Sequence, residues 1–316
     1  MKCLCCGKTL RTVSESGWHK NCIQTFFGTT QLPHIEIDDR TLETLAIESA
    51  GKGYTVPGVQ KKLSLHLLSE GDAPRLTLVN YPTGYILKPQ VKQFEALPES
   101  EHLVMCMADA VGIATVPQAL IQNGDSYAYI TKRIDRVMYN EHHETLAMED
   151  FCQLGFRLTR DKYLGSYEQC GKTIKRYSAR SGLDLSELFI RVVFFYITGN
   201  SDMHLKNFSL IETAPGSMEY ALSRAYDLLP VKVIMPEDNE EFALAMNGKK
   251  TNIRKKDFLQ FAETIGIMKE TAQKMISQLV AKKDLLQSMC MESNLPDHLK
   301  TTFSELMEKR CAVLTS

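Results

Sequence analysis

Residues 199–208 read GNSDMHLKNF, and this decapeptide is the stretch that decides the fold. It follows a long apolar segment, Leu185–Thr198, that we expect to form a helix ended by Gly199. The decapeptide places Asp202 and Asn207 five residues apart on one loop. Taken alone, it is also compatible with an Asp202 that caps a following helix and an Asn207 that lies in a turn. Residues elsewhere in the chain decide between these two interpretations.

The interval between the acid and the amide suits phosphoryl transfer. In kinase catalytic loops of the pattern H-R-D-x-x-x-x-N, the Asp faces the incoming hydroxyl and the Asn oxygen ligates magnesium from the same turn. A second acid, Asp227, stands twenty residues after Asn207, beyond a strand-like segment at Tyr220–Leu222. Mg²⁺ prefers hard oxygen ligands, so an Asp and an Asn in this relation indicate a site for magnesium and phosphate. A turn Asp that ends a strand is the alternative for Asp227.

A lysine upstream supplies a candidate partner for phosphate. Lys88 lies in the segment GYILKP, residues 84–89, where apolar neighbours predict a strand and the ammonium group needs an anion. Thirteen residues later, Glu101 falls in the first turn of a helix that apolar spacing predicts over 98–111. Glu101 could pair with Lys88 or complement the helix dipole, and Glu99 is a rival for the same pairing.

A turn that contains Gly51, Gly53 and Gly58 stands before the first predicted strand. A loop of this kind can place backbone N–H groups over phosphates, although an ordinary turn has the same composition. The chain has no Walker A sequence, which argues against a P-loop NTPase.

Length and composition set the broad class of the protein. A chain of 316 residues is long enough for about two domains. Apolar residues make up 44% and charged residues 24%, with 37 Lys and Arg against 38 Asp and Glu, so disorder and a strongly basic nucleic-acid surface are excluded. The longest apolar stretch, Leu188–Ile197, is far shorter than the ~20 residues that cross a bilayer, and the N-terminus lacks the apolar core of a signal peptide. We therefore expect no membrane contact and a cytoplasmic location, where thiols stay reduced.

Four of the nine cysteines lie in the first 22 residues and mark a small N-terminal module, residues 1–28. Two short chelating pairs joined by a loop suit a tetrahedral Zn²⁺, and so short a segment cannot bury a core without such a staple. Free thiols are the alternative, and Cys5 could replace Cys3 as a ligand. We expect the aromatics that follow, Phe26 and Phe27, to dock the module on the rest of the chain. The two candidate pairs are Cys3 with Cys6 and His19 with Cys22.

The remaining sequence pattern predicts an α+β organisation. The dipeptide Asn123-Gly124 predicts a hairpin between two strands in 115–131. After Met148 the chain is predicted to be mostly helical, with one amphipathic helix over Met268–Met289. A helix is also predicted from Asp39 to the glycine turn. Alternating apolar residues separated by turns predict an antiparallel meander of three strands, at 63–67, 76–79 and 85–87.

Seven motifs of the chain resemble those of HipA-family serine/threonine kinases. They extend over roughly residues 50–260 and occur in the order that the family shows. The motifs are TVPGVQKKL at 55–63, ILKP at 86–89, PESEH at 98–102, TKRIDR at 131–136, MEDFCQ at 148–153, GNSDMHLKN at 199–207 and AYDL at 225–228.

The resemblance implies a bilobal kinase fold related to phosphatidylinositol kinases, with a sheet-rich N-lobe over 29–134 and a mainly helical C-lobe over 135–316. It implies an ATP- and Mg²⁺-dependent serine/threonine protein kinase that acts as the toxin of a toxin–antitoxin pair. Some members limit themselves by autophosphorylation of a serine, and Thr55 takes the place of that serine here. Pro57 stands where others have a small or hydroxylated residue, and it removes one backbone donor from the ATP loop.

The resemblance also implies roles for individual residues. The backbone of Lys132–Ile134 would hold adenine as the hinge, although an acid and an aromatic are more usual there. The implied catalytic and metal-binding residues are Asp202 as base, Asn207 and Asp227 as magnesium ligands, and Lys88 as the phosphate-binding lysine with Glu101 as its partner. Further implied positions are His204 and Lys206 in support of the catalytic loop, Asp135 near the ribose, and Val56, Gly58, Val59 and Gln60 in the loop over the ATP phosphates.

The partners that the resemblance implies are a protein with a serine or threonine acceptor and a small helix-turn-helix antitoxin of the HipB type. DNA would be bound only through that antitoxin. The resemblance further implies that the first 28 residues would replace the longer N-terminal subdomain of the full-length toxins, and that a separate small polypeptide could supply that subdomain. Two alternatives stay open: a small-molecule or lipid kinase of the same fold, and a catalytically silent module that holds an antitoxin on DNA.

Overall fold

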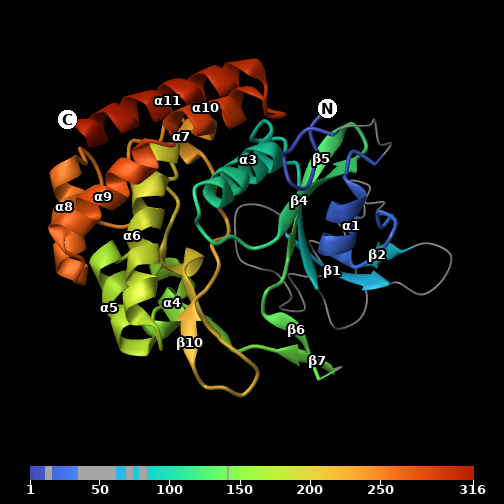
Figure 1. Ribbon diagram of the computed structural model, residues 1–316, viewed down its shortest axis with the longest axis horizontal. Helices are drawn as coiled ribbons and strands as arrows, with labels where there is room; N and C mark the ends of the chain where they lie inside the picture. The colour runs from blue at the N-terminus through green and yellow to red at the C-terminus, as the bar shows by residue number, and fades with distance from the viewer. Residues whose placement is uncertain (11–15, 35–61, 69–73, 78–83, 141) are drawn as a thin grey trace. The chain divides into compact units, whose positions relative to one another are not determined.

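Compactness divides the chain into two units, which we describe separately. Unit 1 comprises Met1–Cys106 and Val116–Arg136, and unit 2 comprises Met107–Thr115 and Val137–Ser316. The predicted domain boundaries at residues 28 and 134 stay predictions. The helix predicted from Asp39 lies outside the described residues. The computed structural model describes residues 1–10, 16–34, 62–68, 74–77, 84–140 and 142–316 (Figure 1).

The described part of unit 1 is built on a five-stranded antiparallel sheet of order β2-β1-β3-β5-β4 (Figure 1). The predicted strands and their antiparallel pairing are confirmed. The predicted meander order is wrong, because β3 pairs with β1 and not with β2. Apolar alternation fixes which face of a strand is buried, but it does not fix which strand lies beside it. The strands are β1 (Leu63–Leu68), β2 (Arg75–Thr77), β3 (Tyr85–Pro89), β4 (Gln118–Asn123) and β5 (Ser126–Lys132).

Helix α3 (Leu97–Ala110) and the β4–β5 hairpin form where the sequence predicts them. Gly112 follows α3 with a φ of 95°, in the left-handed region that favours glycine. Gly124 in the hairpin turn has a φ of 58°, as the Asn-Gly turn requires. These local signals therefore determined both elements.

The N-terminal segment packs on the sheet of unit 1 through the aromatic side chains of α1 (Lys20–Phe27). The rings of Phe26 and Phe27 lie 5.8 and 5.4 Å from the ring of Tyr85 on β3. The hydroxyl of Tyr85 donates to the backbone oxygen of Phe26 at 3.2 Å. Trp18 adds a third ring, 5.7 Å from Phe26. The predicted docking of these aromatics is confirmed.

The described part of unit 2 is mainly helical and carries a small antiparallel sheet of order β10-β9-β8 (Figure 1). Its strands are β8 (Met148–Asp150), β9 (Ser209–Glu212) and β10 (Tyr220–Leu222), and a ribbon of β6 (Arg136–Tyr139) and β7 (His142–Thr145) precedes them in the chain. The helices are α4 (Phe151–Leu154), α5 (Tyr167–Tyr177), α6 (Ser181–Thr198), α7 (Val231–Ile234), α8 (Lys255–Ile265), α9 (Lys269–Val280), α10 (Lys283–Met291) and α11 (Asp297–Thr315). Short 3₁₀ turns lie at η1 (Thr159–Asp161) and η2 (Leu205–Asn207).

Helix α6 is the central element of unit 2, and its residues 192–197 are buried. Gly199 ends the helix as predicted, with a φ of 70°. A Cβ atom at this position would lie 2.6 Å from a side-chain carbon of Leu306. Glycine is therefore required both by the backbone conformation and by the close approach of α11.

The single helix predicted over Met268–Met289 is wrong. The chain forms α9 and α10 there, with Ala281 and Lys282 between them. Helix α9 packs against α8, α6 and α11, whereas α10 packs mainly against α11. Tertiary packing thus interrupts a helical period that is continuous in the sequence.

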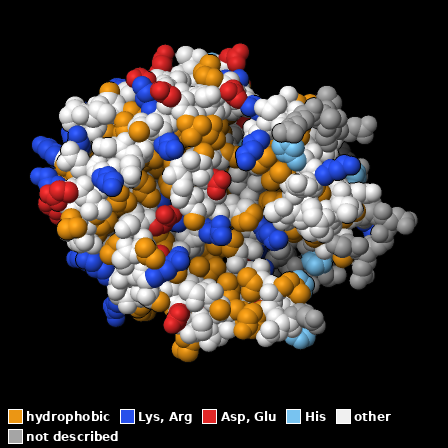
Figure 2. Space-filling view, viewed as in Figure 1, with side chains coloured by type: hydrophobic (Ala, Val, Ile, Leu, Met, Phe, Trp, Pro, Cys, Tyr) orange, Lys and Arg blue, Asp and Glu red, His pale blue; other side chains and the backbone are white. Residues whose placement is uncertain are grey.

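In the described ranges, none of the helices combines the length and the apolar character that crossing a bilayer requires. On the face drawn in Figure 2, Lys and Arg side chains are interspersed with Asp, Glu and hydrophobic ones. This mixed surface agrees with the net charge of −1.

Candidate functional site

The β9–β10 hairpin brings the predicted magnesium ligands to one end of the small sheet. The two strands are antiparallel, so the start of β9 lies beside the end of β10. Asn207 stands just before β9, and Asp227 follows β10. The N–H of Ser223 donates to the backbone oxygen of Ser209 at 2.9 Å, which holds the two chain segments together.

The loop between α6 and β9 holds Asp202 and Asn207 in a fixed relation. The side-chain nitrogen of Asn207 donates to the backbone oxygen of Asp202 at 2.9 Å, and the N–H of His204 donates to the same oxygen at 2.9 Å. A carbonyl oxygen only accepts, so the amide of Asn207 must present its nitrogen there and its oxygen elsewhere. Asn207 is 9% exposed, so its Oδ1 is a largely buried, oriented oxygen that suits a hard cation.

The carboxylate of Asp202 accepts a hydrogen bond that the sequence does not predict. The hydroxyl of Tyr163 donates to Oδ1 of Asp202 at 2.7 Å, from 39 residues earlier in the chain. The tyrosine ring packs edge-on against the imidazole of His204, with centroids 5.1 Å apart. Burial and the hydrogen bond to Asp202 raise the pKa of Tyr163, so its hydroxyl keeps its proton at neutral pH. The sequence gives no signal for this contact, because residues 156–164 mix four apolar or aromatic side chains with five polar or charged ones and show no helical or strand period.

His204 is buried within the loop between α6 and β9. Burial lowers its pKa, against the opposite influence of the negative charges of Asp202 and Asp227, so its imidazole is neutral at pH 7. In the part of the chain that the structure describes, Nδ1 of His204 has no hydrogen-bond partner. Its predicted support of the loop would therefore act through packing, and stays a prediction.

Lys206 is tied to the sheet of unit 2. Its ammonium group donates to Oδ2 of Asp150, at the end of β8, and the two atoms are 2.5 Å apart. The hydroxyl of Tyr226 donates to the backbone oxygen of Lys206 at 3.2 Å and lies 2.6 Å from Oγ of Ser209. These bonds hold the loop between α6 and β9 against β8, β9 and the segment that carries Asp227.

Asp227 has a left-handed backbone conformation with a φ of 57°. Such conformations are uncommon for a residue other than glycine, and they concentrate at functional sites. Buried charged groups of α6 hold the residues before it: Arg191 donates to the backbone oxygen of Ser223 at 2.9 Å, and Asp184 accepts from the N–H of Leu222 at 2.6 Å. The sheet and α6 together thus fix where Asp227 lies.

In unit 1, Lys88 on β3 pairs with Glu101 on α3. The Nζ and Oε1 atoms are 2.5 Å apart, and the side chains are 3% and 0% exposed. The ammonium group also lies over the ring of Tyr129, 5.2 Å from its centroid. The structure thus pairs Lys88 with Glu101 rather than with the rival Glu99. Burial raises the pKa of Glu99, whose Oε2 lacks a hydrogen-bond partner among the described residues.

Within the described ranges of the chain, one backbone N–H of the predicted hinge makes no hydrogen bond to the protein. The N–H groups of Lys132 and Arg133 already donate to backbone oxygens of unit 1 at 2.9 and 2.8 Å, which leaves the N–H of Ile134. The carboxylate of Asp135 pairs with Arg133 at 2.7 Å and with Arg136 at 2.8 Å. A contact of Asp135 with a ribose would have to compete with these two ion pairs.

Residues 54–285 match the model of the HipA-like C-terminal domain family, which is well over half of the chain. The chain belongs to this family. All seven motifs that predict the HipA family lie within the matched residues, and the prediction is confirmed. Of the HipA-type positions, Thr55 and the ATP-loop residues Val56, Gly58, Val59 and Gln60 lie outside the described residues.

Relatives of this HipA-like chain carry kinase names. A protein of Haemophilus influenzae, named "Putative kinase", is 28% identical over 295 residues, which are 83% of this chain and 82% of the relative. "Putative kinase Y4mE" of Sinorhizobium fredii is 28% identical over 244 residues, 73% of this chain and 55% of its own length. "Putative kinase Y4dM" of the same organism is 31% identical over 214 residues, 63% of this chain and 49% of its own length. The chain thus spans about half of each Sinorhizobium protein.

Two solved structures share the fold. One is HipA of Shewanella oneidensis MR-1, from a complex of HipA, HipB and operator DNA, with a TM-score of 0.68 and 17% identity over 85% of this chain and 70% of that chain. The other is the Helicobacter pylori proinflammatory kinase CtkA, with a TM-score of 0.54 and 14% identity over 89% of this chain and 93% of that chain. The predicted α+β fold of the HipA kinase type is therefore confirmed.

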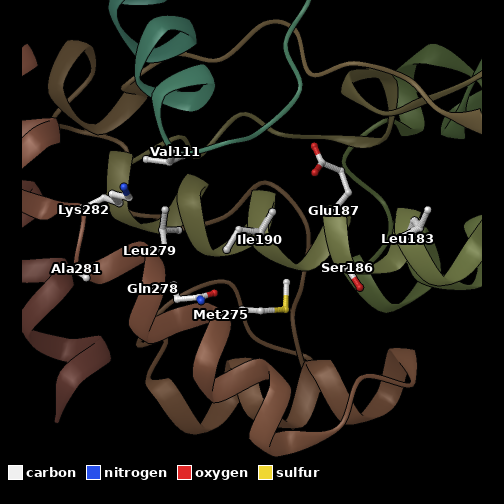
Figure 3. A pocket seen from close by; sticks show the side chains of 10 residues that line it. All are labelled: Val111, Leu183, Ser186, Glu187, Ile190, Met275, Gln278, Leu279, Ala281 and Lys282. Atoms are coloured by element: carbon white, nitrogen blue, oxygen red, sulfur yellow. The ribbon is translucent and has the colours of Figure 1, made fainter.

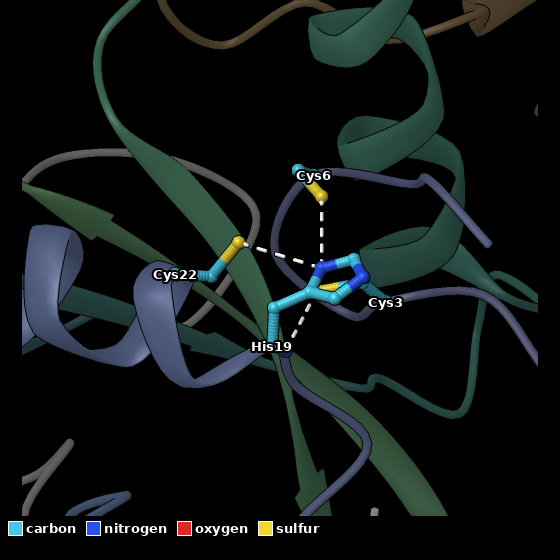
Figure 4. A group of neighbouring side chains, drawn as sticks. All are labelled: Cys3, Cys6, His19 and Cys22. Atoms are coloured by element: carbon cyan, nitrogen blue, oxygen red, sulfur yellow. Dashed lines mark hydrogen bonds between the residues drawn. The ribbon is translucent and has the colours of Figure 1, made fainter. Parts of the chain in front are cut away.

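A cluster of thiols and one imidazole lies outside the residues that match the HipA-like family model (Figure 4). The ligand atoms of Cys3, Cys6, His19 and Cys22 all lie within 4.8 Å of one another. Nδ1 of His19 is 3.5 Å from Sγ of Cys6 and 3.7 Å from Sγ of Cys22. Ligand atoms around a tetrahedral zinc ion are separated by about 3.5–3.8 Å, so the spacing fits zinc. Cys5 is not part of the group, and burial raises the pKa of its thiol.

The cluster is joined to the sheet of unit 1 through its backbone. The carbonyl oxygen of Leu4, between two of the candidate ligands, accepts from the N–H of Leu120 on β4 at 2.7 Å. Cys3 itself is buried. The N-terminal module is thus hydrogen-bonded to the edge strand β4 in addition to packing its aromatics on β3.

A groove in unit 2, drawn in Figure 3, is lined mainly by side chains of α6 and α9. It contains none of the predicted site residues. Its acidic residue, Glu187, already pairs with Arg191 at 2.8 Å. We assign no catalytic role to this groove.

Proposed function

We propose that the chain is an ATP- and Mg²⁺-dependent kinase that transfers the γ-phosphate to a serine or threonine hydroxyl of a protein. The observation that carries this proposal is the orientation of Asn207. Its amide nitrogen is bound to the backbone of Asp202, so its oxygen faces elsewhere, at the end of the small sheet that Asp227 follows in the chain. This is the arrangement of base and metal ligands that phosphoryl transfer needs.

The residues of the chain take distinct roles in the proposed reaction. Asp202 accepts the proton of the acceptor hydroxyl. Asn207, through Oδ1, and Asp227 would hold Mg²⁺, which neutralises charge on the transferring phosphoryl group. Lys88 would bind phosphate oxygens, and its pairing with Glu101 orients the ammonium group in a buried site.

The test is transfer of radiolabelled phosphate from ATP, with the protein alone and with cell lysate. The Asp202→Asn variant keeps the side-chain shape but cannot accept the proton, so we expect a loss of about 10²–10⁴-fold. Asp297→Asn, which changes a fully exposed carboxylate at the start of α11, is the matched control and should transfer as the wild type does. Turnover of Asp202→Asn near the wild-type rate would contradict the assignment.

We also propose that the kinase limits itself through Thr55. A phosphate there would add close to two negative charges in the loop that the HipA family uses over the nucleotide phosphates, and repulsion would lower ATP affinity. Mass spectrometry after incubation with ATP and Mg²⁺ should find phosphothreonine at Thr55 in the wild type and none in Asp202→Asn. Phosphate only at other residues, or a Thr55→Asp variant that binds ATP as tightly as the wild type, would contradict self-limitation.

A helix-turn-helix antitoxin is the partner that we propose. The support is the fold shared with Shewanella HipA, whose solved complex contains HipB and operator DNA. Co-purification with a helix-turn-helix protein encoded beside the gene should yield a complex that binds DNA, while the kinase alone should not. DNA binding by the isolated kinase would contradict this proposal.

We propose one structural Zn²⁺ per chain at the N-terminal cluster. Two sulfur–imidazole distances of 3.5 and 3.7 Å support it, and the zinc would join the first turn of the chain to the start of α1. Metal analysis of protein without a histidine tag should find one zinc, which Cys22→Ser loses. Cys5→Ser is the matched control and should keep the metal. Loss of zinc in Cys5→Ser, or none in the wild type, would contradict the ligand set.

A further inference from the structure

The segment 156–164, between α4 and α5, reaches the catalytic loop. The backbone oxygen of Lys162 accepts from the N–H of Leu205 at 3.1 Å. The hydroxyl of Tyr163 donates to the carboxylate of Asp202 at 2.7 Å. The segment is therefore fixed beside the carboxylate to which an acceptor hydroxyl has to come.

Three large apolar side chains of this segment are exposed, among the charged side chains of Arg157, Arg160, Asp161 and Lys162. Phe156 is 94% exposed, Leu158 61% and Leu164 62%. Single exposed apolar side chains are ordinary, but three within nine residues next to a reacting group indicate a surface that becomes covered. The described residues of the chain itself leave these side chains open to solvent.

The conformation of Phe156 gives an independent indication. Phe156 follows α4 with a φ of 53°, at a helix end where the left-handed conformation is normally taken by glycine. Its N–H donates to the backbone oxygen of Gln153 at 2.9 Å, a bond that glycine would make equally well. The Cβ atom of Phe156 therefore strains the backbone, while its ring is almost fully exposed in the free protein. Its use must lie in a bound state.

We propose that the 156–164 segment receives the protein acceptor and selects a serine or threonine flanked by apolar side chains. This inference rests on the proposed kinase function and names its substrate class. The hydrogen bond between Tyr163 and Asp202 attaches the segment that carries the exposed apolar side chains to the proposed base. The carboxylates of Asp202, Asp238 and Glu240 act on Tyr163, while the segment itself carries Arg157, Arg160 and Lys162 against Asp161. The surroundings therefore carry both signs of charge, and the assignment of a protein acceptor rests on the contact with Asp202.

Fluorescence anisotropy of labelled peptides tests the proposal without any transfer step. Two peptides of equal length carry a single serine, flanked by leucines in one and by glycines in the other. We expect the wild type to bind the leucine peptide more tightly, and Phe156→Gly to lose about 10-fold of that affinity. Phe156→Gly should also raise the unfolding temperature by about 2–4 °C, because glycine relieves the left-handed strain. Leu164→Ala should weaken binding of the same peptide.

Met218→Gly is the matched control. Met218 is also apolar, 80% exposed and left-handed, with a φ of 55°, but it lies in the β9–β10 turn, at the end of the hairpin away from Asn207. It should bind both peptides as the wild type does. Equal binding of the two peptides by the wild type, or an equal loss in Met218→Gly, would overturn the proposal. So would loss of sedimentation with phosphatidylserine vesicles in Phe156→Gly, which would make the segment a membrane contact. Failure of the kinase function itself would show separately, as absence of radiolabel transfer.

Discussion

Removing the carboxylate of Glu101 should destabilise unit 1, and removing the charge of Lys88 as well should restore the stability without restoring activity. In Glu101→Leu, the ammonium group of Lys88 stays in a place where the side chain is 3% exposed, without its 2.5 Å partner. In the double variant Lys88→Met/Glu101→Leu, two apolar side chains of similar volume replace the ion pair. Glu101→Leu lacks the carboxylate that orients Lys88, and the double variant also lacks the ammonium group proposed to bind phosphate.

The expected magnitude follows from burial. Breaking a buried ion pair by removing one partner typically costs about 3–5 kcal/mol, whereas an apolar replacement of both partners is often neutral or stabilising. The ring of Tyr129, 5.2 Å from the ammonium group, offsets part of the loss. We therefore expect Glu101→Leu to lose about 3 kcal/mol of unfolding free energy and the double variant to regain most of it.

Urea unfolding followed by tryptophan fluorescence measures this effect in the right unit. Trp18 is the chain's single tryptophan, and it is buried in unit 1 among Phe26 and Phe27. Glu99→Gln is the control on the same helical turn, because Glu99 does not pair with Lys88. The reasoning is refuted if the double variant is no more stable than Glu101→Leu, if Glu99→Gln loses as much, or if the stable double variant transfers phosphate at the wild-type rate.

Three further outcomes are expected. The pKa of His204 is lowered in the folded protein, so the unfolded chain binds more protons and the unfolding free energy should fall as the pH drops through about 6.5. Urea titrations at pH 7.5 and 5.5 should show a smaller fall in His204→Gln than in the wild type, and an equal fall would contradict the burial argument. Gly199→Ala should lose about 2 kcal/mol or more of unfolding free energy, because alanine would have to adopt a φ of 70° and its Cβ atom would meet Leu306. An unchanged melting temperature would show that the end of α6 tolerates a side chain. Asp227→Asn should keep the left-handed turn, which Asn tolerates, but calorimetry should show that it loses magnesium-dependent ATP binding. Binding as tight as that of the wild type would show that Asp227 is not a metal ligand.

Local signals in the sequence were sufficient for much of the fold. The apolar spacing of 98–111 predicted α3 to within one residue at each end, and Asn123-Gly124 predicted the β4–β5 hairpin. Glycine at 199 predicted the end of α6. Each of these elements depends on residues within a few positions of one another, which is the range that period and turn chemistry describe.

Contacts between distant residues were beyond these signals. The pairing of β3 with β1 depends on which strand edge is free, and the break at Ala281 depends on helices that pack from elsewhere in unit 2. For the site, the interval of Asp202 and Asn207 was visible, but the hydrogen bond from Tyr163 joins residues 39 apart with no motif between them. The choice of Glu101 over Glu99 likewise needed the direction of two side chains on one helical turn.

The hydrogen bond between Leu4 and Leu120 joins a segment that is synthesised early to a strand that is synthesised later. At 5–20 residues per second, residues 3–22 leave the ribosome roughly 5–20 s before Leu120 does. The four proposed zinc ligands all belong to the earlier segment, so the metal can close this segment before any strand exists to receive it. The zinc-bound segment would then be folded before β4 is synthesised and able to bond to it. A chelator present during cell-free synthesis should therefore lower the soluble yield more than the same chelator added afterwards. Equal yields would mean that the sheet forms first and the metal enters last.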